Sequence, residues 1–141
     1  MKSDYQHYSN MAWYVHDIYF VAISTFYLYA RGKQDLILNL FGIILTVHLL
    51  YLAASFRVLK HCAFKEAKDF GEMVPYKKLY KIHLDQWFPY MIIIWFLGLL
   101  WLWELSGFFE HQLEIHIIFS EIWTAIAAFF TFYYRNKFGI L

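Results

Sequence analysis

The sequence predicts an all-α integral membrane protein with four transmembrane helices, paired as two hairpins in one domain over residues 1–141. The first observation is composition, because 61% of the residues are hydrophobic and only 16% are charged. In soluble globular chains, hydrophobic residues average roughly 45–50% and charged residues about 25%. A soluble protein of this length has too much surface to cover with so few charges. The second observation is that seven of the twelve Lys and Arg residues lie in one polar segment, residues 57–83, between apolar runs.

The apolar runs have the length that crossing a bilayer requires, about 20 residues in a helix. They predict four membrane spans, at about residues 11–30, 36–56, 84–109 and 113–134. Gly32 is a plausible helix stop after the first span. The second helix should continue beyond the membrane through Lys68, because Gly71 and Pro75 are the first residues that interrupt it.

Basic residues predict the orientation of the spans. The N-terminal tail, residues 57–83 and the C-terminal tail hold one, seven and two Lys or Arg residues, and the other two loops hold two and none. Clustered basic residues stay on the cytoplasmic side, so both termini and the long extension over residues 57–83 should be cytoplasmic. The predicted location is the inner (cytoplasmic) membrane, with the mitochondrial inner membrane as the alternative. The net charge of +1, with no basic groove-reading element, argues against a nucleic acid partner.

The extension is expected to bind anionic lipid headgroups or a soluble subunit through its lysines. These are Lys60, Lys65, Lys68, Lys77, Lys78 and Lys81. Cys62 is the only cysteine, so the chain has no intrachain disulfide, and a reduced thiol is expected in this compartment.

Histidines inside the spans are the candidate cofactor ligands. Two axial imidazoles from different helices, at similar depth, are what a buried haem b requires. His16 and His48 form the best pair, with estimated depths that differ by about 4–5 Å, and His83 is a third candidate. A quinone is the other cofactor considered. The simpler alternative is that each imidazole makes a hydrogen bond between helices.

Two carboxyl groups at membrane depth, Asp17 and Glu121, are candidates for handling protons. Glu121 lies near the bilayer centre, where it should be protonated or paired; the alternative is a protonated carboxyl that makes one structural hydrogen bond. Glu114, Glu121 and Ala128 recur every seven residues, as in the seam of a helix bundle. The opposite face of this helix carries His116, Ser120, Trp123 and Ala127.

The second span also has two distinct faces. Small and polar residues form one stripe, suited to close packing against another helix: Asn39, Gly42, Thr46 and Ala53. His48 is nine residues from Asn39, which places it about 180° away. If the stripe faces the protein's own helices, His48 should face a second subunit or a cofactor.

A weak metal site is conceivable at the other membrane face, where His111, Glu114 and His116 lie close in sequence. A di-iron helix bundle needs Glu-x-x-His. Leu113 stands three residues before His116, so that motif is absent.

Part of the chain resembles a known family of small haem membrane proteins. The segments TVHLLYLAASFRVLKHCAF, YKKLYKIHLDQWFPYMIIIWFLGLLWLW and FFEHQLEIHIIF look like the HemJ-type protoporphyrinogen oxidases and their CopD-like relatives. The matching positions are His48, Arg57, Lys78–Tyr80, Pro89–Met91 and His111. The resemblance implies haem binding and membrane redox chemistry. The chain departs from the family at Leu113, where the family has Lys, and it lacks the family's last helix.

Three functional hypotheses follow. The first is a redox or electron-transfer component that binds haem b or a quinone. The alternative is a non-catalytic accessory subunit of a larger inner-membrane complex, with other membrane subunits or further copies of itself as partners. The third is a small proton-linked transporter that uses Asp17 and Glu121. No residue pattern identifies a catalytic group or decides whether the protein is an enzyme.

Overall fold

The computed structural model describes residues 2–69 and 87–133, and within these ranges every regular element is a helix. The elements are α1 (Lys2–Ala30), α2 (Leu36–Asp69), α4 (Trp87–Ser106), α5 (Gln112–Ala128) and a short π-helix, η1 (Phe129–Tyr133). The predicted all-α class is confirmed for this part of the chain.

Three of the described helices are long and apolar enough to cross a membrane: Leu36–Phe56, Pro89–Ser106 and Gln112–Phe132. The chain is thus built like a membrane protein. The first predicted span, residues 11–30 of α1, does not belong to this set. That stretch contains four tyrosines together with Asp17, which make it less apolar than the other three.

The helix ends follow the local sequence. α1 ends at Ala30, and Gly32 has a φ of 77°, the left-handed conformation expected of a glycine after a helix. Asp35 caps α2, because its Oδ1 accepts the backbone N–H groups of Ile37 and Leu38 at 2.9 and 3.2 Å. α2 ends at Asp69, which confirms that this helix continues past its apolar part.

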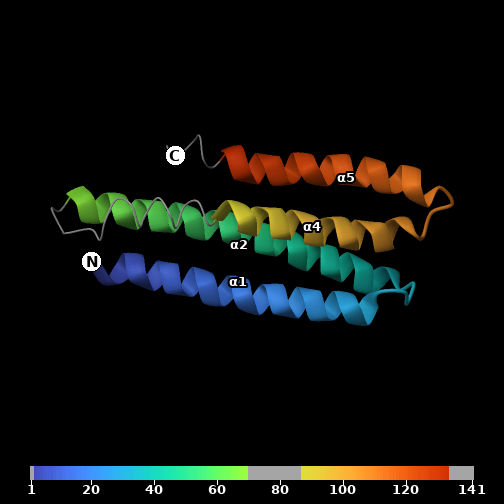
Figure 1. Cartoon of the computed structure of the whole chain (residues 1–141), viewed down its shortest axis with the longest axis horizontal. Helices are drawn as coiled ribbons and strands as arrows, with labels where there is room; N and C mark the ends of the chain where they lie inside the picture. Colours follow the sequence, from blue (N-terminus) through green and yellow to red (C-terminus); the bar gives the residue numbers. More distant parts are fainter. Residues whose placement is uncertain (1, 70–86, 134–141) are drawn as a thin grey trace.

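The helices pack in a definite order. α2 contacts α1 and α4, α4 also contacts α5, and η1 contacts α2. Figure 1 shows α1 and α5 at opposite edges of the molecule, with α2 and α4 between them. The start of α1 and the ends of α2 and α5 lie at one end, and the turns after α1 and α4 lie at the other. α5 is therefore an outer helix supported mainly by α4.

The contact between α2 and α4 is centred on a tryptophan that covers a glycine. Trp101 of α4 is fully buried, and its indole lies so close to Gly42 of α2 that a Cβ at Gly42 would overlap the ring. Phe26 and Tyr27 of α1 complete the enclosure, with ring centroids 5.5 and 5.2 Å from Trp101. Glycine is required here because it lets the two helices approach closely.

The small-residue stripe predicted for the second span forms part of this interior. Asn39 and Thr46 are each 1% exposed, Ala53 is fully buried and Gly42 is buried. Of the two faces that the sequence distinguished on this helix, the small-residue stripe is the one that packs against helices of the same chain.

The contact between α4 and α5 uses the same device. Trp123 of α5 is 5% exposed and lies against Gly98 of α4, again with no room for a Cβ. Trp123 Nε1 donates to the carbonyl of Trp95 at 2.8 Å, and Trp95 Nε1 donates to Thr124 Oγ1 at 3.0 Å. One tryptophan and two hydrogen bonds therefore fix α5 on α4.

Candidate functional site

His16 lies inside the molecule, where α1, α2 and α4 meet. Its side chain is 6% exposed. The imidazole is 5.2 Å from the ring of Tyr90 on α4 and 6.3 Å from the ring of Phe56 on α2, measured between ring centroids. The sequence placed this histidine at membrane depth, and the structure encloses it with aromatic side chains.

Asp17, the next residue, has a hydrogen-bonding partner on another helix. The hydroxyl of Tyr90 donates to Asp17 Oδ1 at 3.4 Å. Tyr90 also contacts the ring of Trp13 edge-on, at 5.3 Å. The Asp17 side chain is itself exposed, so it forms the outer edge of this cluster.

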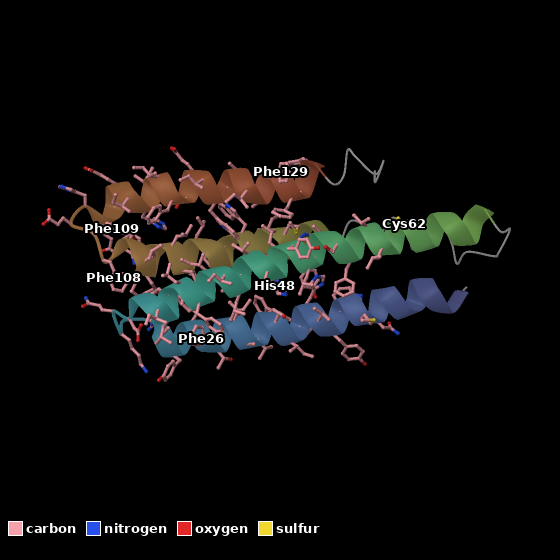
Figure 2. All side chains as sticks on the ribbon, turned by 180° about the vertical axis from the view of Figure 1, so that it is seen from behind. Phe26, His48, Cys62, Phe108, Phe109 and Phe129 are labelled. Atoms are coloured by element: carbon pink, nitrogen blue, oxygen red, sulfur yellow. The ribbon has the colours of Figure 1, made fainter. Side chains whose placement is uncertain are left out.

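His48 has different surroundings. Its side chain is exposed, and its ring lies 5.7 Å from Tyr19 of α1 and 6.4 Å from Tyr51 of its own helix. Figure 2 shows it near the middle of α2, where that helix passes α1. The exposure agrees with the helical phase, which put His48 opposite the small-residue stripe.

The two predicted haem ligands lie on adjacent helices, His16 beside Tyr90 and Phe56, and His48 beside Tyr19 and Tyr51. Tyr19, beside His48, is three residues from His16 on α1, or about 4.5 Å along the helix. Phe56, beside His16, is eight residues from His48 on α2, or about 12 Å. The haem assignment stays a prediction for this pair. The third predicted ligand, His83, lies outside the described residues.

Glu121 lies on the outer side of α5. Trp123 faces α4, and Glu121 and Ala125 are each two residues from it, a rotation of roughly 200°. Both side chains are exposed. The seven-residue seam that the sequence suggested for a bundle interior thus points away from the protein's own helices. The interior face is the other one, which carries His116, Ser120, Trp123 and Ala127.

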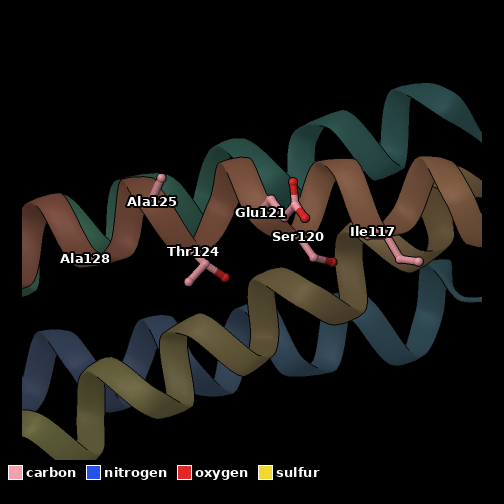
Figure 3. Close-up of a pocket in the computed structure, with 6 residues that line it drawn as sticks. All are labelled: Ile117, Ser120, Glu121, Thr124, Ala125 and Ala128. Carbon is pink, nitrogen blue, oxygen red and sulfur yellow. The ribbon is translucent and has the colours of Figure 1, made fainter.

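The surface of α5 is hollowed beside Glu121. An open pocket of about 510 Å³ is lined by small or polar side chains and one isoleucine: Ile117, Ser120, Glu121, Thr124, Ala125 and Ala128. Figure 3 shows Thr124 on the side of α5 nearer α4, and Ala125 on the opposite side. The hollow forms because the side chains around this turn are short.

The predicted metal residues do not converge. His111 and Glu114 are exposed, whereas His116 packs edge-on against Trp103 at 5.1 Å and lies 3.4 Å from Ser120 Oγ. Among the residues that the structure describes, no three His, Cys, Asp or Glu side chains are grouped to hold a metal ion.

The structure does not describe the side chains of the lysines that were predicted to bind lipid headgroups. Lys60, Lys65 and Lys68 belong to α2, but their side chains are not described, and Lys77, Lys78 and Lys81 lie outside the described residues. Cys62 is a free, exposed cysteine on the polar end of α2.

One cluster was not found from the sequence. Glu104 of α4 accepts the hydroxyl of Tyr27 at 3.4 Å and the backbone N–H of Gly32 at 3.2 Å. It thereby ties the turn after α1 to the end of α4. Tyr27 precedes Glu104 by 77 residues, so no local pattern could reveal the pair.

Comparison with known proteins adds no family. No protein-family model matches the chain, and neither curated proteins nor solved structures provide a match. The likeness to the HemJ-type oxidases therefore stays a prediction that rests on the quoted residues.

Proposed function

We propose that this chain is a non-catalytic subunit of a larger membrane assembly, in which a partner helix covers the outer face of α5. Glu121 carries this proposal. It lies nine residues after Gln112 and eleven before Phe132, in the middle of an apolar span, and its side chain is exposed. An ionisable group at that depth is costly against lipid and normally faces protein or a water-filled cavity. A partner helix removes the carboxyl group from lipid.

The proposed topology has four spans, with both termini and the extension over residues 57–83 on the cytoplasmic side of an inner membrane. The distribution of Lys and Arg supports it. So does the fold, because the start of α1 and the end of α2 lie at one end of the molecule (Figure 1). In this topology α1 also crosses the membrane, in addition to the three strongly apolar helices. α2 extends past the membrane and carries the basic residues towards lipid headgroups.

The test is the size of the particle extracted from its native membrane with a copolymer that keeps surrounding lipid. We expect more than one polypeptide per particle. Ala125→Phe should release single chains, because the larger side chain fills the hollow where the partner helix approaches. Particles that contain one copy of this chain and no other protein would rule the proposal out.

A matched control separates loss of a partner from general damage. Ala22 is exposed on α1, the helix that lies at the edge of the molecule opposite α5 (Figure 1). Ala22→Phe adds the same bulk at a position proposed to face lipid and should leave the particle unchanged. If both variants dissociate the particle equally, the outer face of α5 is not the specific contact.

A haem- or quinone-binding redox protein is the second candidate, and the burial of His16 among Tyr90 and Phe56 favours it. His16 and His48 would be the axial ligands, and the haem would supply one-electron chemistry. The purified protein should then show a Soret band that is lost in His16→Ala and His48→Ala. Thr25→Ala, which alters an exposed residue of α1, should retain the band. A colourless protein that yields no quinone on extraction rejects this candidate.

A further inference from the structure

We propose that the helix covering α5 is the α5 of a second copy of this chain, packed parallel to the first about a two-fold axis along the membrane normal. This inference rests on the proposed function, since it requires that the outer face of α5 be covered. It adds the identity of the partner and the residues of each copy that meet.

The spacing on the outer face fits such a pairing. Residues at alternating intervals of four and three form one stripe: Glu114, Ile118, Glu121, Ala125 and Ala128. This is the 3.5-residue period of a seam between two parallel helices. Ile118 is 52% exposed, and Glu114, Glu121 and Ala125 are exposed as well, whereas Ala128 is half-buried. The described helices of the same chain therefore leave the first four positions of this seam uncovered.

The shape of the face favours a close approach. The stripe is bulky at Ile118 but narrow at Ala125 and Ala128, beside the open pocket. Small residues in membrane helices let two backbones come together, where dispersion contacts and hydrogen bonds hold them. A parallel copy presents its own small residues at the same depth, so two hollows meet and the helices can approach.

The chemistry of Glu121 is self-complementary. A protonated carboxyl group has one donor and further acceptor capacity, so it can donate to a second carboxyl group and also accept from it. An axis along the membrane normal puts Glu121 level with Glu121 of the partner subunit. Each carboxyl group then gains a hydrogen-bonding partner without any other chain.

The position of α5 leaves room for this contact. It lies at one edge of the molecule, and α1 lies at the opposite edge (Figure 1). Two copies can therefore join through α5 while their α1 helices remain on the far side of each molecule. The α5 span is also the least enclosed of the three apolar spans. The buried share of its most apolar stretch is 11%, against 33% for each of the other two.

Cysteine cross-linking in native membranes tests the pairing in the full chain. In a Cys62→Ser background, Ala125→Cys and Ile118→Cys should each give an oxidised dimer of this chain. Val21→Cys, on the lipid-facing side of α1, is the matched control and should stay monomeric. Co-purification of two differently tagged copies gives a second readout. It should weaken roughly 10-fold in Glu121→Ala, the scale of one good interhelical hydrogen bond, and stay within about 2-fold in Glu121→Gln.

The outcomes distinguish the two proposals. If neither seam cysteine cross-links and the extracted particle still contains other proteins, the proposed function stands and the second copy is ruled out. If the particle holds one chain alone, both fall. His48 offers a further check, because it is another exposed ionisable group within an apolar span. Mixed copies with His48→Cys and Ala125→Cys that join only to each other would show an off-axis contact and overturn the two-fold arrangement.

Discussion

The two sides of α4 are built alike but are supported differently. On one side Trp101 lies over Gly42 of α2, and on the other Gly98 lies under Trp123 of α5. Trp101 is fully buried because Phe26 and Tyr27 of α1 close over it. Trp123 is 5% exposed, and its helix packs mainly on α4, while the following η1 contacts α2. A tryptophan packed against a glycine therefore lies inside the group of α1, α2 and α4 on one side of α4. On the other side the same contact attaches the single helix α5.

This difference indicates how the molecule divides its roles. α1, α2 and α4 enclose Trp101 without another chain, although Asp17 and His48 on these helices are exposed. One face of α5 packs on α4, and the face that carries Glu121 is left exposed. Because the cost of an exposed carboxyl group is paid only in lipid, the asymmetry has consequences in a membrane that it would not have in water.

The largest effect is expected from Gly42→Leu. The new side chain must displace a tryptophan that has no free space around it. We therefore expect a loss of about 3 kcal/mol in the free energy of unfolding, the upper end of the usual effect of overpacking. SDS titration of the purified protein should show loss of the folded state at much lower detergent fraction. Ala22→Leu, which adds the same side chain at an exposed position of α1, should change little. Equal loss in the two variants would contradict the central role of the contact between Trp101 and Gly42.

Gly98→Leu should act on α5 and spare the other helices. We expect a cost of about 1–2 kcal/mol, because Trp123 can shift outward with its helix. Spin labels at Phe96 and Ile122, both exposed, should move apart and give a broader distance distribution in this variant. Labels at Val21 and Ile44 on α1 and α2, also exposed, should keep their separation. A change in both pairs would mean that α5 is part of one cooperative unit with the rest.

The smallest effect is expected from Thr124→Val. It removes the acceptor for Trp95 Nε1 while keeping the shape of the side chain. Hydrogen bonds between membrane helices average about 0.6 kcal/mol, so the SDS midpoint should fall slightly. Thr25→Val, at an exposed position of α1, is the control. A loss as large as that of Gly98→Leu would show that hydrogen bonds, and not the fit of tryptophan to glycine, hold α5.

Much of the fold could be predicted because it depends on local features. The apolar runs have the length of membrane helices, Gly32 marks the end of α1, and no residue interrupts α2 before Asp69. Periodicity also separated each of α2 and α5 into two faces. On α2 the face with small residues is the one that the structure buries, as suits close contact between helices.

The candidate sites were less predictable. The phase of α5 separated Glu121 from Trp123 but assigned the Glu121 seam to the interior, whereas the fit of Trp123 against Gly98 turns that seam outward. His16 and His48 were paired by estimated depth, yet His16 is enclosed by Tyr90 and Phe56 and His48 is exposed beside Tyr19. Depth along a helix follows from residue number, whereas direction around its axis follows from the neighbours.

The sequence alone predicted the helical class of the described residues, the apolar spans of α2, α4 and α5, and the two faces into which α2 and α5 divide. Length, hydrophobicity and helical period set these properties within one segment at a time. Only the tertiary structure decided which faces are enclosed and which distant residues meet, such as Tyr90 with Asp17, 73 residues apart. Those choices depend on how particular side chains fit across helices, and shape complementarity between remote segments has no signature within either one.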